Sequence, residues 1–577
     1  MNLFLDIAYL FLIFLLFHLV VLGYGLIFKK NISDNTIGEI GISGFITIYI
    51  ISISIHFFSA INNTIIYIFL IIGLCLFFIN LKYLKKKIKI DLSLILILAL
   101  SFLCINTNSV HDDFYWYHLP TINYIQNSKI VFGIGAINDQ LNFGHGYYNI
   151  ASLFSFPFLK GNTIYLPAII FLNFFFFHIC EIKKNNNFLI INTFIYIVIL
   201  IVLFRFTRFK EFGIEIVAFS IIALIQLYLI QFFINKDKIY FVKSIILITF
   251  GFFIKPYIAF VSFIFIYYLF FFKKKILYLL NFNKILLISS IIIISFAKNF
   301  IQSGCILYPQ AQTCFKKEII SWSIESEVAK KRIDQLKSLS RGIAVYSKLN
   351  QTEILNADEY LKKFKFNFLK NVVKDPDINK LLVCFVLILI IKFIFIFKNK
   401  KDKNLINNGV AAIYLGSILS FFAFLFMPNS RFGGYNFLSF FLFTIFFIKF
   451  KKNILKDDIR YALNIFLLIG IIYFTSKNIF RIKNEAEKSL DFPKVKISDI
   501  KYKETEKFSY PLNISSHEYF CGNIRFICVP KNNLEGLMDI KIINNYLFFY
   551  SNTNQIIKKI EKETADILYK REKFSVK

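Results

Sequence analysis

MNLFLDIAYLFLIFLLFHLVVLGYGLIFKK, residues 1–30, decides the class of fold. Its apolar run, 3–27, ends in a pair of lysines, and roughly 17–25 apolar residues are needed for a helix to cross a bilayer. The stretch has no basic leader and no small-residue cleavage site, so it predicts a retained membrane helix rather than a signal peptide. Similar runs recur along the chain, which therefore predicts a polytopic membrane protein.

The composition agrees with this class. Of the 577 residues, 57% are hydrophobic, whereas a soluble domain has about 45–50%. The net charge of +31 would suggest nucleic acid as the partner of a soluble protein. Here most lysines stand in short clusters between apolar runs, which is the pattern of cytoplasmic loops. The expected partner is therefore the lipid bilayer, and no nucleic acid is expected.

The spacing of the apolar runs predicts an all-α polytopic membrane protein with about 14 transmembrane helices. With every lysine cluster placed in the cytoplasm, the connections alternate and the N-terminus lies outside. The predicted spans are 3–27, 37–59, 64–81, 91–106, 162–180, 187–204, 212–234, 239–255, 257–272, 284–299, 379–397, 407–427, 435–449 and 459–475.

The outer connections are very unequal in length. Two are long, 107–161 and 300–378, and the second has helical spacing over 325–372. The polar tail also faces out; it mixes strand-like runs such as RFICV and YLFFY with a helix expected at 554–571, so it predicts a small α+β domain. The chain is divided into N-terminal accessory helices, a transmembrane core and this extracytoplasmic domain, at 1–90, 91–475 and 476–577.

Four of the eight cysteines form two close pairs on the predicted outer side, Cys305 with Cys314 and Cys521 with Cys528. Disulfides form in oxidising compartments, so both pairs are expected to be disulfides. Neither spacing is the short one of zinc ligands, which makes a metal site the weaker alternative. The first pair lies in SGCILYPQAQTCF, 303–315, which we interpret as a clipped turn that covers a cavity.

The first long outer loop carries HDDFYWYHLPTINYIQNS, 111–128. A helix cap followed by an amphipathic interfacial helix would explain one carboxylate and the aromatic residues. It would not explain two adjacent carboxylates, Asp112 and Asp113, because like charges disfavour each other's ionisation unless a cation or a donor compensates. Such a pair suits a divalent cation or a general base. Both interpretations stay open on these residues alone.

The pattern D-x-x-x-YHLP-x-x-x-YIQNS, from Asp113 to Ser128, resembles the first periplasmic loop of bacterial GT-C-fold membrane glycosyltransferases. The resemblance is closest to poorly characterised members with a D-x-x-x-YHLP signature. It implies a GT-C-like core in the bacterial inner membrane, with the catalytic loops and the C-terminal domain on the periplasmic side. The spans before residue 91 are a departure, because a minimal core lacks them.

The resemblance also implies an activity. Members of this superfamily take a sugar from a polyprenyl-phosphate carrier and attach it to a glycan, lipid or protein acceptor outside the membrane, as in cell-surface polysaccharide assembly. Asp113 matches their acidic residue, which acts as catalytic base or metal ligand, and Tyr117 and His118 complete the motif. Asp112 is added because it is adjacent. A divalent cation, Mg or Mn, at Asp112 and Asp113 is the one cofactor considered.

A polyprenyl-phosphate donor requires cations at the outer surface of the bilayer. The candidates at predicted outer ends of spans are Arg205, Arg208, Lys255, Lys298 and Arg431. The arginine fork matches phosphate oxygens, although snorkelling to lipid headgroups would explain any one of these residues alone.

Three further residues are weighed for the same site. His145, between two glycines, lines a sugar site or belongs to a simple turn. Glu211 and Glu215 share a helical face with Arg208, and they either supply a second acidic group facing Asp113 or pair with that arginine. Trp322 stacks on a sugar ring or is buried in the core of its loop.

Three alternatives remain. An O-antigen polymerase or ligase would also have many spans and outer arginines, but would not show the D-x-x-x-YHLP motif. A lipid-linked sugar flippase or transporter predicts charges in mid-membrane and inverted repeats, and no such repeat is evident. A scaffold without catalytic activity is the third. The chain contains no P-loop.

Overall fold

The computed structural model describes the greater part of the chain. The described residues are 3–27, 36–87, 91–105, 117–143, 145–155, 163–186, 188–205, 213–235, 237–263, 281–349, 355–372, 374, 386, 408–429, 434–436, 457–488, 502–504, 509–511 and 537–562. Most of them are helical, as the sequence predicts.

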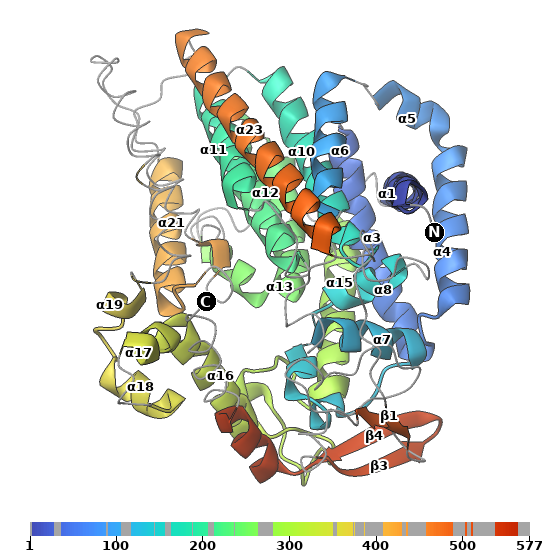
Figure 1. The fold of residues 1–577 in the computed structure, drawn as a ribbon, viewed down its shortest axis with the longest axis vertical. Coiled ribbons are helices and arrows are strands. Elements are labelled where there is room, and N and C mark those ends of the chain that lie inside the picture. Colours follow the sequence, from blue (N-terminus) through green and yellow to red (C-terminus); the bar gives the residue numbers. More distant parts are fainter. Residues whose placement is uncertain are drawn as a thin grey trace.

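The long helices and the seven-residue α5 form a bundle (Figure 1). They are α1 (Leu3–Gly25), α3 (Ile37–Phe58), α4 (Asn63–Ile79), α5 (Leu81–Lys87), α6 (Leu92–Ile105), α10 (Leu166–Asn185), α11 (Leu189–Arg205), α12 (Ile214–Asn235), α13 (Lys238–Ile254), α15 (Phe282–Ser303), α21 (Asn408–Phe426) and α23 (Asp457–Lys488). Among the described residues, six helices are long and apolar enough to cross a membrane, namely α1, α3, α10, α12, α15 and α23.

A seventh span results if α4 and α5, bent by 71° at their junction, are counted together, and three shorter apolar helices lie in α6, α11 and α21. The protein is therefore a multi-pass membrane protein. Part of the predicted set of spans falls outside the described residues, including all or nearly all of 379–397 and 435–449. The predicted span 257–272 begins as a 3-10 helix, η4 (Pro256–Ser262), instead of an α-helix.

The two ends of the bundle differ in character (Figure 1). At one end, which we call the lysine end, lie α5 with its lysines, the last residues of α10 and the first residues of α13. At the other end, which we call the loop end, lie the described parts of 117–155, 301–372 and 537–562. In the described part of the chain, the predicted cytoplasmic lysine clusters near α5, α10 and α13 and the long connections therefore lie at opposite ends.

The helices at the N-terminal side pack through glycines. A Cβ atom at Gly23 of α1 would lie 2.0 Å from the carbonyl oxygen of Gly73 on α4, and one at Gly44 of α3 would lie 2.1 Å from the carbonyl oxygen of Val21. Glycine removes the side chain where two helix backbones approach closely, which is how helices associate in a membrane. This packing places α1 between α3 and α4.

Short elements build the loop end. They are α7 (Leu119–Asn127), η2 (Ile134–Ala136), η3 (Asp139–Phe143), α8 (Tyr147–Phe154), η5 (Ala311–Thr313), α16 (Ser326–Ser340), α17 (Ile343–Leu349), α18 (Ala357–Lys363), α19 (Leu369–Val372) and η6 (Gly434–Asn436). The helical spacing predicted over 325–372 is confirmed by α16, α17 and α18.

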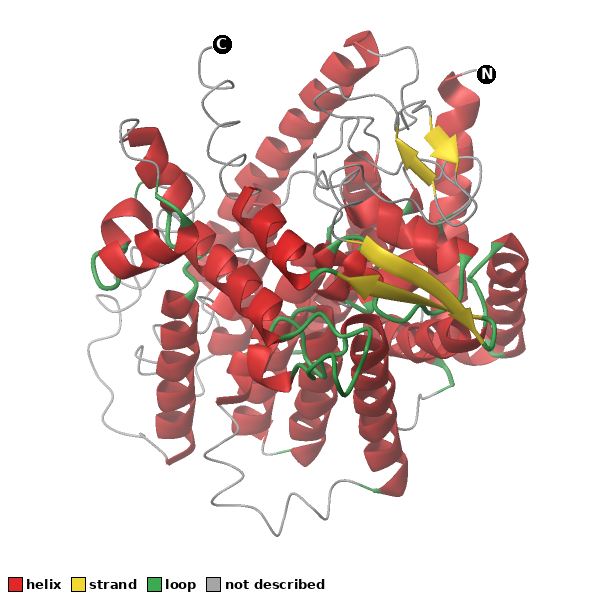
Figure 2. Ribbon diagram, turned by 90° about the horizontal axis from the view of Figure 1, so that it is seen from below, coloured by secondary structure: helices red, strands yellow, loops and turns green. Residues whose placement is uncertain are grey.

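The tail contributes two antiparallel hairpins and a helix at 553–562. β1 (Tyr502–Glu504) pairs with β2 (Ser509–Pro511), and β3 (Leu537–Ile543) pairs with β4 (Tyr546–Ser551). Figure 2 shows the β3–β4 hairpin lying across the loop end. The predicted strand YLFFY is thus β4, whereas RFICV lies outside the described residues. α23 continues past residue 475, where the sequence places a domain boundary, to Lys488.

Candidate functional site

The motif helix is buried in the loop end. α7 follows Tyr117 and His118, and its residues 121–125 are buried. His118 is also buried, and its Nδ1 lies 2.8 Å from the hydroxyl oxygen of Tyr148 on α8. The Tyr117 ring lies beside it, 4.2 Å away between centroids. The sequence suggested a helix lying at the membrane interface. In the structure this helix, α7, packs against α8 and the end of α3.

Tyr148 lies close to both His118 and His145 of this loop. Its ring lies 5.8 Å from that of His118 and 6.3 Å from that of His145, and its N–H donates to the His145 carbonyl oxygen. The N–H of the next residue, Gly146, donates to the carbonyl oxygen of Phe253 near the end of α13. A Cβ at Gly146 would lie 2.1 Å from the Tyr49 ring, so glycine is required at this approach.

Lys298, predicted as a phosphate ligand, lies in the same region. It is on α15, 2% exposed, and its Nζ donates to Asn149 Oδ1 of α8 at 2.6 Å. Asn149 is fully buried, and its Nδ2 has no hydrogen-bond partner among the described residues. A buried amide donor without an acceptor costs free energy, about 1–3 kcal/mol, unless a ligand or a water accepts from it.

Among the described residues Glu215 contacts Lys255 and Tyr257; its predicted partners Asp113 and Arg208 lie outside them. Its Oε1 lies 2.9 Å from Lys255 Nζ, beyond the end of α13, and its Oε2 accepts at 3.4 Å from the hydroxyl of Tyr257 on η4. Asn436 of η6 donates to the Tyr257 carbonyl oxygen at 2.9 Å and so links η6 to η4. Glu215 is therefore the counter-ion of Lys255, whereas Arg208 and Glu211 lie outside the described residues.

These groups converge on His145. Removal from water lowers the pKa of His145 well below its usual value, and the positive charges of Lys255, Lys298 and His118 lower it further. The imidazole is therefore neutral at pH 7. It is influenced by the side chains of Lys255, just after α13, and Lys298 of α15, and the latter donates to Asn149.

We call His118, His145, Asn149, Lys255 and Lys298 the cationic cluster. Its chemistry is that of an anion site, because ammonium groups and an amide N–H stabilise negative oxygens in a place removed from water. By itself this set does not fit a divalent cation, since two lysines would repel it. Among the described residues, moreover, no three His, Cys, Asp or Glu side chains are grouped as metal ligands.

The remaining predicted site residues do not join this cluster in the described part of the chain. Arg205 ends α11 and is half-buried. Asp112, Asp113, Arg208, Glu211, Arg431, Cys521 and Cys528 lie outside the described residues.

Sequence reasoning did not single out Tyr148, Asn149 or Tyr257. Nothing in the local sequence distinguishes these residues from the many other tyrosines and asparagines of the chain. Their roles depend on contacts with α7, α12 and α15, which are remote in sequence.

A second group that sequence reasoning did not single out holds the segments of the loop end together. Asp139 of η3 is fully buried and accepts from Arg332 Nε and Nη2 of α16 at 2.5 and 2.6 Å. Tyr308 donates to the same carboxylate at 3.2 Å, and Lys559 Nζ lies 3.7 Å from it. Burial would raise the pKa of Asp139, but Arg332 and Lys559 outweigh it and lower the pKa below the usual value. This clamp joins both long loops to the tail.

The turn at 303–315 and Trp322 reinforce the same assembly. Cys305 and Cys314 are joined by a disulfide, with 2.08 Å between the sulfur atoms. Trp322 lies 5.0 Å from Phe132 and 5.5 Å from Phe548 between ring centroids. Trp322 is thus part of an aromatic core between the first loop and β4. This agrees with the packing role considered for it, rather than with stacking on a sugar ring.

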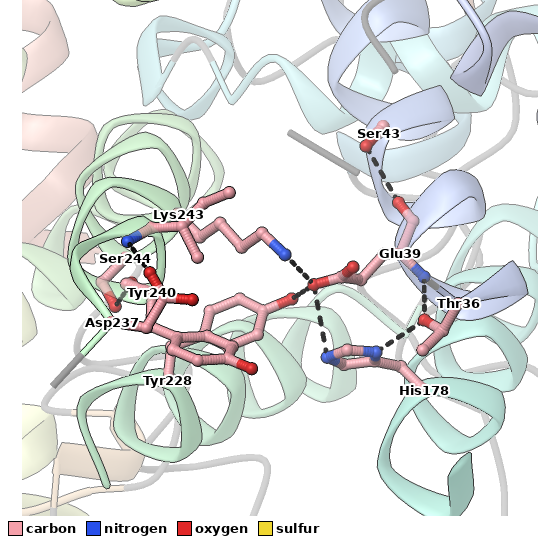
Figure 3. A network of polar contacts seen from close by, with 10 residues as sticks. Thr36, Glu39, Ser43, His178, Tyr228, Asp237, Tyr240, Lys243 and Ser244 are labelled. Carbon is pink, nitrogen blue, oxygen red and sulfur yellow. Dashed lines mark hydrogen bonds and ion pairs between the residues drawn. The ribbon is translucent and has the colours of Figure 1, made fainter. Parts of the chain in front are cut away.

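A separate polar network lies near the lysine end (Figure 3). Glu39 Oε1 of α3 accepts from Lys243 Nζ of α13 at 2.7 Å and from the Tyr228 hydroxyl of α12 at 2.8 Å. His178 of α10 points its Nε2 at the same oxygen, 3.7 Å away, and its Nδ1 lies 2.7 Å from Thr36 Oγ1. Four helices therefore meet at one buried carboxylate, between membrane-spanning segments.

Comparison with known proteins gives a family but no activity. A family model described as a domain of unknown function (DUF8201) matches residues 7–438. No curated protein and no solved structure matches the chain.

Proposed function

The chain belongs to the family described as a domain of unknown function (DUF8201), and from its cationic cluster we propose that it is a membrane glycosyltransferase. It transfers a sugar from a polyprenyl-phosphate carrier to a glycan, lipid or protein acceptor on the side of the loop end. The observation that carries the proposal is that Lys255 and Lys298 both act electrostatically on His145, in the same loop as the D-x-x-x-YHLP motif, with Lys298 held by Asn149 and Lys255 by Glu215.

The position of the cluster suits a lipid-linked phosphate. Lys255 follows the last residue of α13, which covers most of the predicted span 239–255, and Lys298 lies in the last turns of the membrane helix α15, so both are at the loop end. A donor with its chain in the bilayer would present its phosphate at this depth. Asn149 Nδ2 is a further donor for a phosphate or sugar oxygen.

The leaving group in this reaction is the carrier phosphate. Preorganised ammonium groups stabilise the charge that develops on it, and this kind of electrostatic term is often the largest in enzymatic catalysis. Glu215 keeps Lys255 in place by an ion pair at 2.9 Å. Lys298, 2% exposed, acts with less competition from water.

The acceptor hydroxyl requires a base, and we assign this role to Asp113. Tyr117, four positions later, lies beside His118 of the cluster. Four residues of chain span at most about 14 Å, so the chain between Asp113 and Tyr117 is short enough for Asp113 to act at the cluster. Asp112 adjoins it. A divalent cation, Mg or Mn, at this acidic pair would orient the acceptor or the phosphate; no step assigned here to the lysines depends on it.

The orientation follows from charge. If the lysine end faces the cytoplasm, the loop end faces the periplasm of the bacterial inner membrane. The Cys305–Cys314 disulfide at the loop end supports this orientation, because disulfides persist in oxidising compartments.

A lipid-linked sugar flippase or transporter is the second candidate, and one observation favours it. The Glu39–Lys243 pair and His178 are ionisable groups buried between membrane helices, which is where a transport pathway would carry them. The lysine partner neutralises this carboxylate within the protein, however, so the network is explained without a transported ion.

The test is sugar transfer by the purified full-length protein in nanodiscs, with a panel of polyprenyl-phosphate sugars and a mixed acceptor pool. We expect turnover by the wild type and its loss in Asp113→Asn. We expect Lys298→Met to lower turnover by about 10²-fold and Lys298→Arg to retain part of it. Lys284→Met, at the opposite end of α15, is the matched control.

The outcomes separate the candidates. Turnover that is unaffected by Asp113→Asn and Lys298→Met would exclude the cationic cluster as the active site. Absence of turnover with every donor, combined with movement of a fluorescent lipid-linked sugar across proteoliposome membranes, would establish the transporter instead.

A further inference from the structure

The tip of the β3–β4 hairpin lies against the end of a membrane helix. Asn544 and Asn545 form the turn, both with positive φ (49° and 62°), as in the two-residue turns that close tight hairpins. The first residue of β4, Tyr546, donates its hydroxyl hydrogen to the carbonyl oxygen of Phe57 at 3.2 Å. Phe57 is the penultimate residue of α3, so the tip stands at the height where this helix leaves the membrane.

The tip exposes apolar side chains at this height. Ile542 is 72% exposed and Ile543 46% exposed, and the last residue of α3, Phe58, is 79% exposed. The neighbouring helix α4 presents an exposed apolar flank that includes Ile68 and Ile71. The tip is thus near an apolar helix surface that a bilayer would cover.

Cations accompany these apolar residues. Lys129 Nζ lies 3.6 Å from the centroid of the Tyr546 ring, and Lys541 is exposed next to Ile542. Tyrosine and lysine side chains are typical of the membrane–water interface, where the ring or stem is apolar and the end meets headgroups. The combination fits a lipid surface with anionic headgroups.

We infer that the β3–β4 tip is seated in the headgroup region of the bilayer leaflet at the loop end, with Ile542 and Ile543 facing the acyl boundary. Phe132 pairs with β4 on its other side, through the Phe132 N–H to the Leu547 carbonyl oxygen and the Phe549 N–H to the Phe132 carbonyl oxygen, each 2.9 Å. The membrane contact therefore reaches the first loop directly. The inference depends on the spans and not on the proposed reaction.

The test uses the full-length protein in nanodiscs with phospholipids that carry bromine near the headgroup end of the acyl chain. Ile542→Trp places a fluorophore at the tip, and Ile319→Trp is the matched control, since Ile319 is a 69% exposed isoleucine in the turn before α16. The wild-type signal from the two native tryptophans is subtracted. We expect quenching by the brominated lipid to be several-fold stronger at position 542 than at 319.

Aqueous acrylamide gives the complementary measurement. The proposal requires strong acrylamide quenching at position 319 and weak quenching at 542. Strong acrylamide quenching at 542 without bromine quenching would overturn it, because the tip would stand in water. Protection from both quenchers would also overturn it, because a protein, such as a second copy paired along β3, would then cover the tip.

Ile543→Trp is the second variant, in case Ile542→Trp distorts the hairpin. Both variants are accepted only if they elute as the wild type does in size exclusion and keep its thermal unfolding midpoint. If a folded Ile543→Trp protein shows the pattern of position 319, with strong acrylamide quenching and weak bromine quenching, the inference is also wrong.

Discussion

Glu39 and Lys243 lie 204 positions apart in sequence and form a buried ion pair of 2.7 Å that joins α3 to α13. Each side chain is at most 4% exposed. Tyr228 and His178 bring α12 and α10 to the same carboxylate, so the packing of four helices depends on one charge (Figure 3).

Removing one partner of this pair should be more harmful than removing both. We expect Glu39→Gln to lower the free energy of unfolding by about 3–5 kcal/mol, because it leaves the Lys243 ammonium buried without its counter-charge. The double variant Glu39→Gln/Lys243→Met should recover part of this loss. Denaturant titration in a mild detergent measures both. Lys238→Met, exposed at the start of α13, is the control. A double variant as unstable as Glu39→Gln alone would contradict the account.

His145 should make stability depend on pH near neutrality. Its pKa is lowered in the folded protein by removal from water and by Lys255, Lys298 and His118, whereas the unfolded value is near 6.5. Below about pH 6.5 His145 therefore binds a proton in the unfolded chain but not in the folded protein. The contribution of His145 to the free energy of unfolding is fully present above this pH and is lost as the pH is lowered. In the variant His145→Gln, the thermal unfolding midpoint should vary less with pH between about pH 7 and 5. An unchanged slope would show that His145 is not the group responsible.

The Asp139–Arg332 clamp should hold the tail on the loops. Arg332→Gln leaves a fully buried carboxylate without its two N–H donors, and we expect a loss of about 3–5 kcal/mol. Arg332→Lys should recover only part of it, since an ammonium group cannot form the paired contact of a guanidinium. Limited proteolysis of the segment 537–562 reports the release. Lys330→Gln, exposed on the same helix, should leave it protected, and equal cleavage of the two Gln variants would argue against the clamp.

The clamp also predicts a response to acid. The pKa of Asp139 is lowered in the folded protein, so its contribution to stability is present above the unfolded pKa, about 3.9, and is lost as the pH falls through the folded value. The wild type should therefore lose stability below about pH 4, and Arg332→Gln should lose less in that window because it has already lost the contact.

The Cys305–Cys314 disulfide should stabilise the loop end. In the loop-entropy model a closed loop of this length contributes about 2–3 kcal/mol. Cys305→Ser/Cys314→Ser, and treatment of the wild type with reductant, should lower the thermal midpoint to a similar extent. Alkylation followed by mass spectrometry measures the pairing independently. Free thiols at both positions in protein purified without reductant would rule out the pair.

The charge pattern predicts which end of the bundle faces the cytoplasm. A cysteine introduced at Lys86, in α5 of the lysine end, should be inaccessible to a membrane-impermeant maleimide added to intact spheroplasts, and one at Ile319, at the loop end, should react. Both should react after lysis. The reverse pattern of labelling would invert the topology and move the cationic cluster to the cytoplasmic side.

The sequence by itself determined the class of the protein and the separation of its two ends. The length of an apolar run and the lysines that follow it are local properties, and a bilayer acts on each run separately, so α1, α3 and α10 could be placed from composition alone. The helix at α16 and the strand at β4 were equally accessible, because their periodicity lies within a few residues.

Only the tertiary structure decided the candidate site. Lys298, His118 and His145 were named from the sequence as separate candidates, but their convergence, together with Asn149 and Lys255, results from the packing of α7, α8, α13 and α15. The ion pair of Glu215 with Lys255 also results from this packing and was not predicted. The packing of helix surfaces that are far apart in sequence determines which charged residues come into contact. This packing cannot be derived from the local sequence pattern of a single chain.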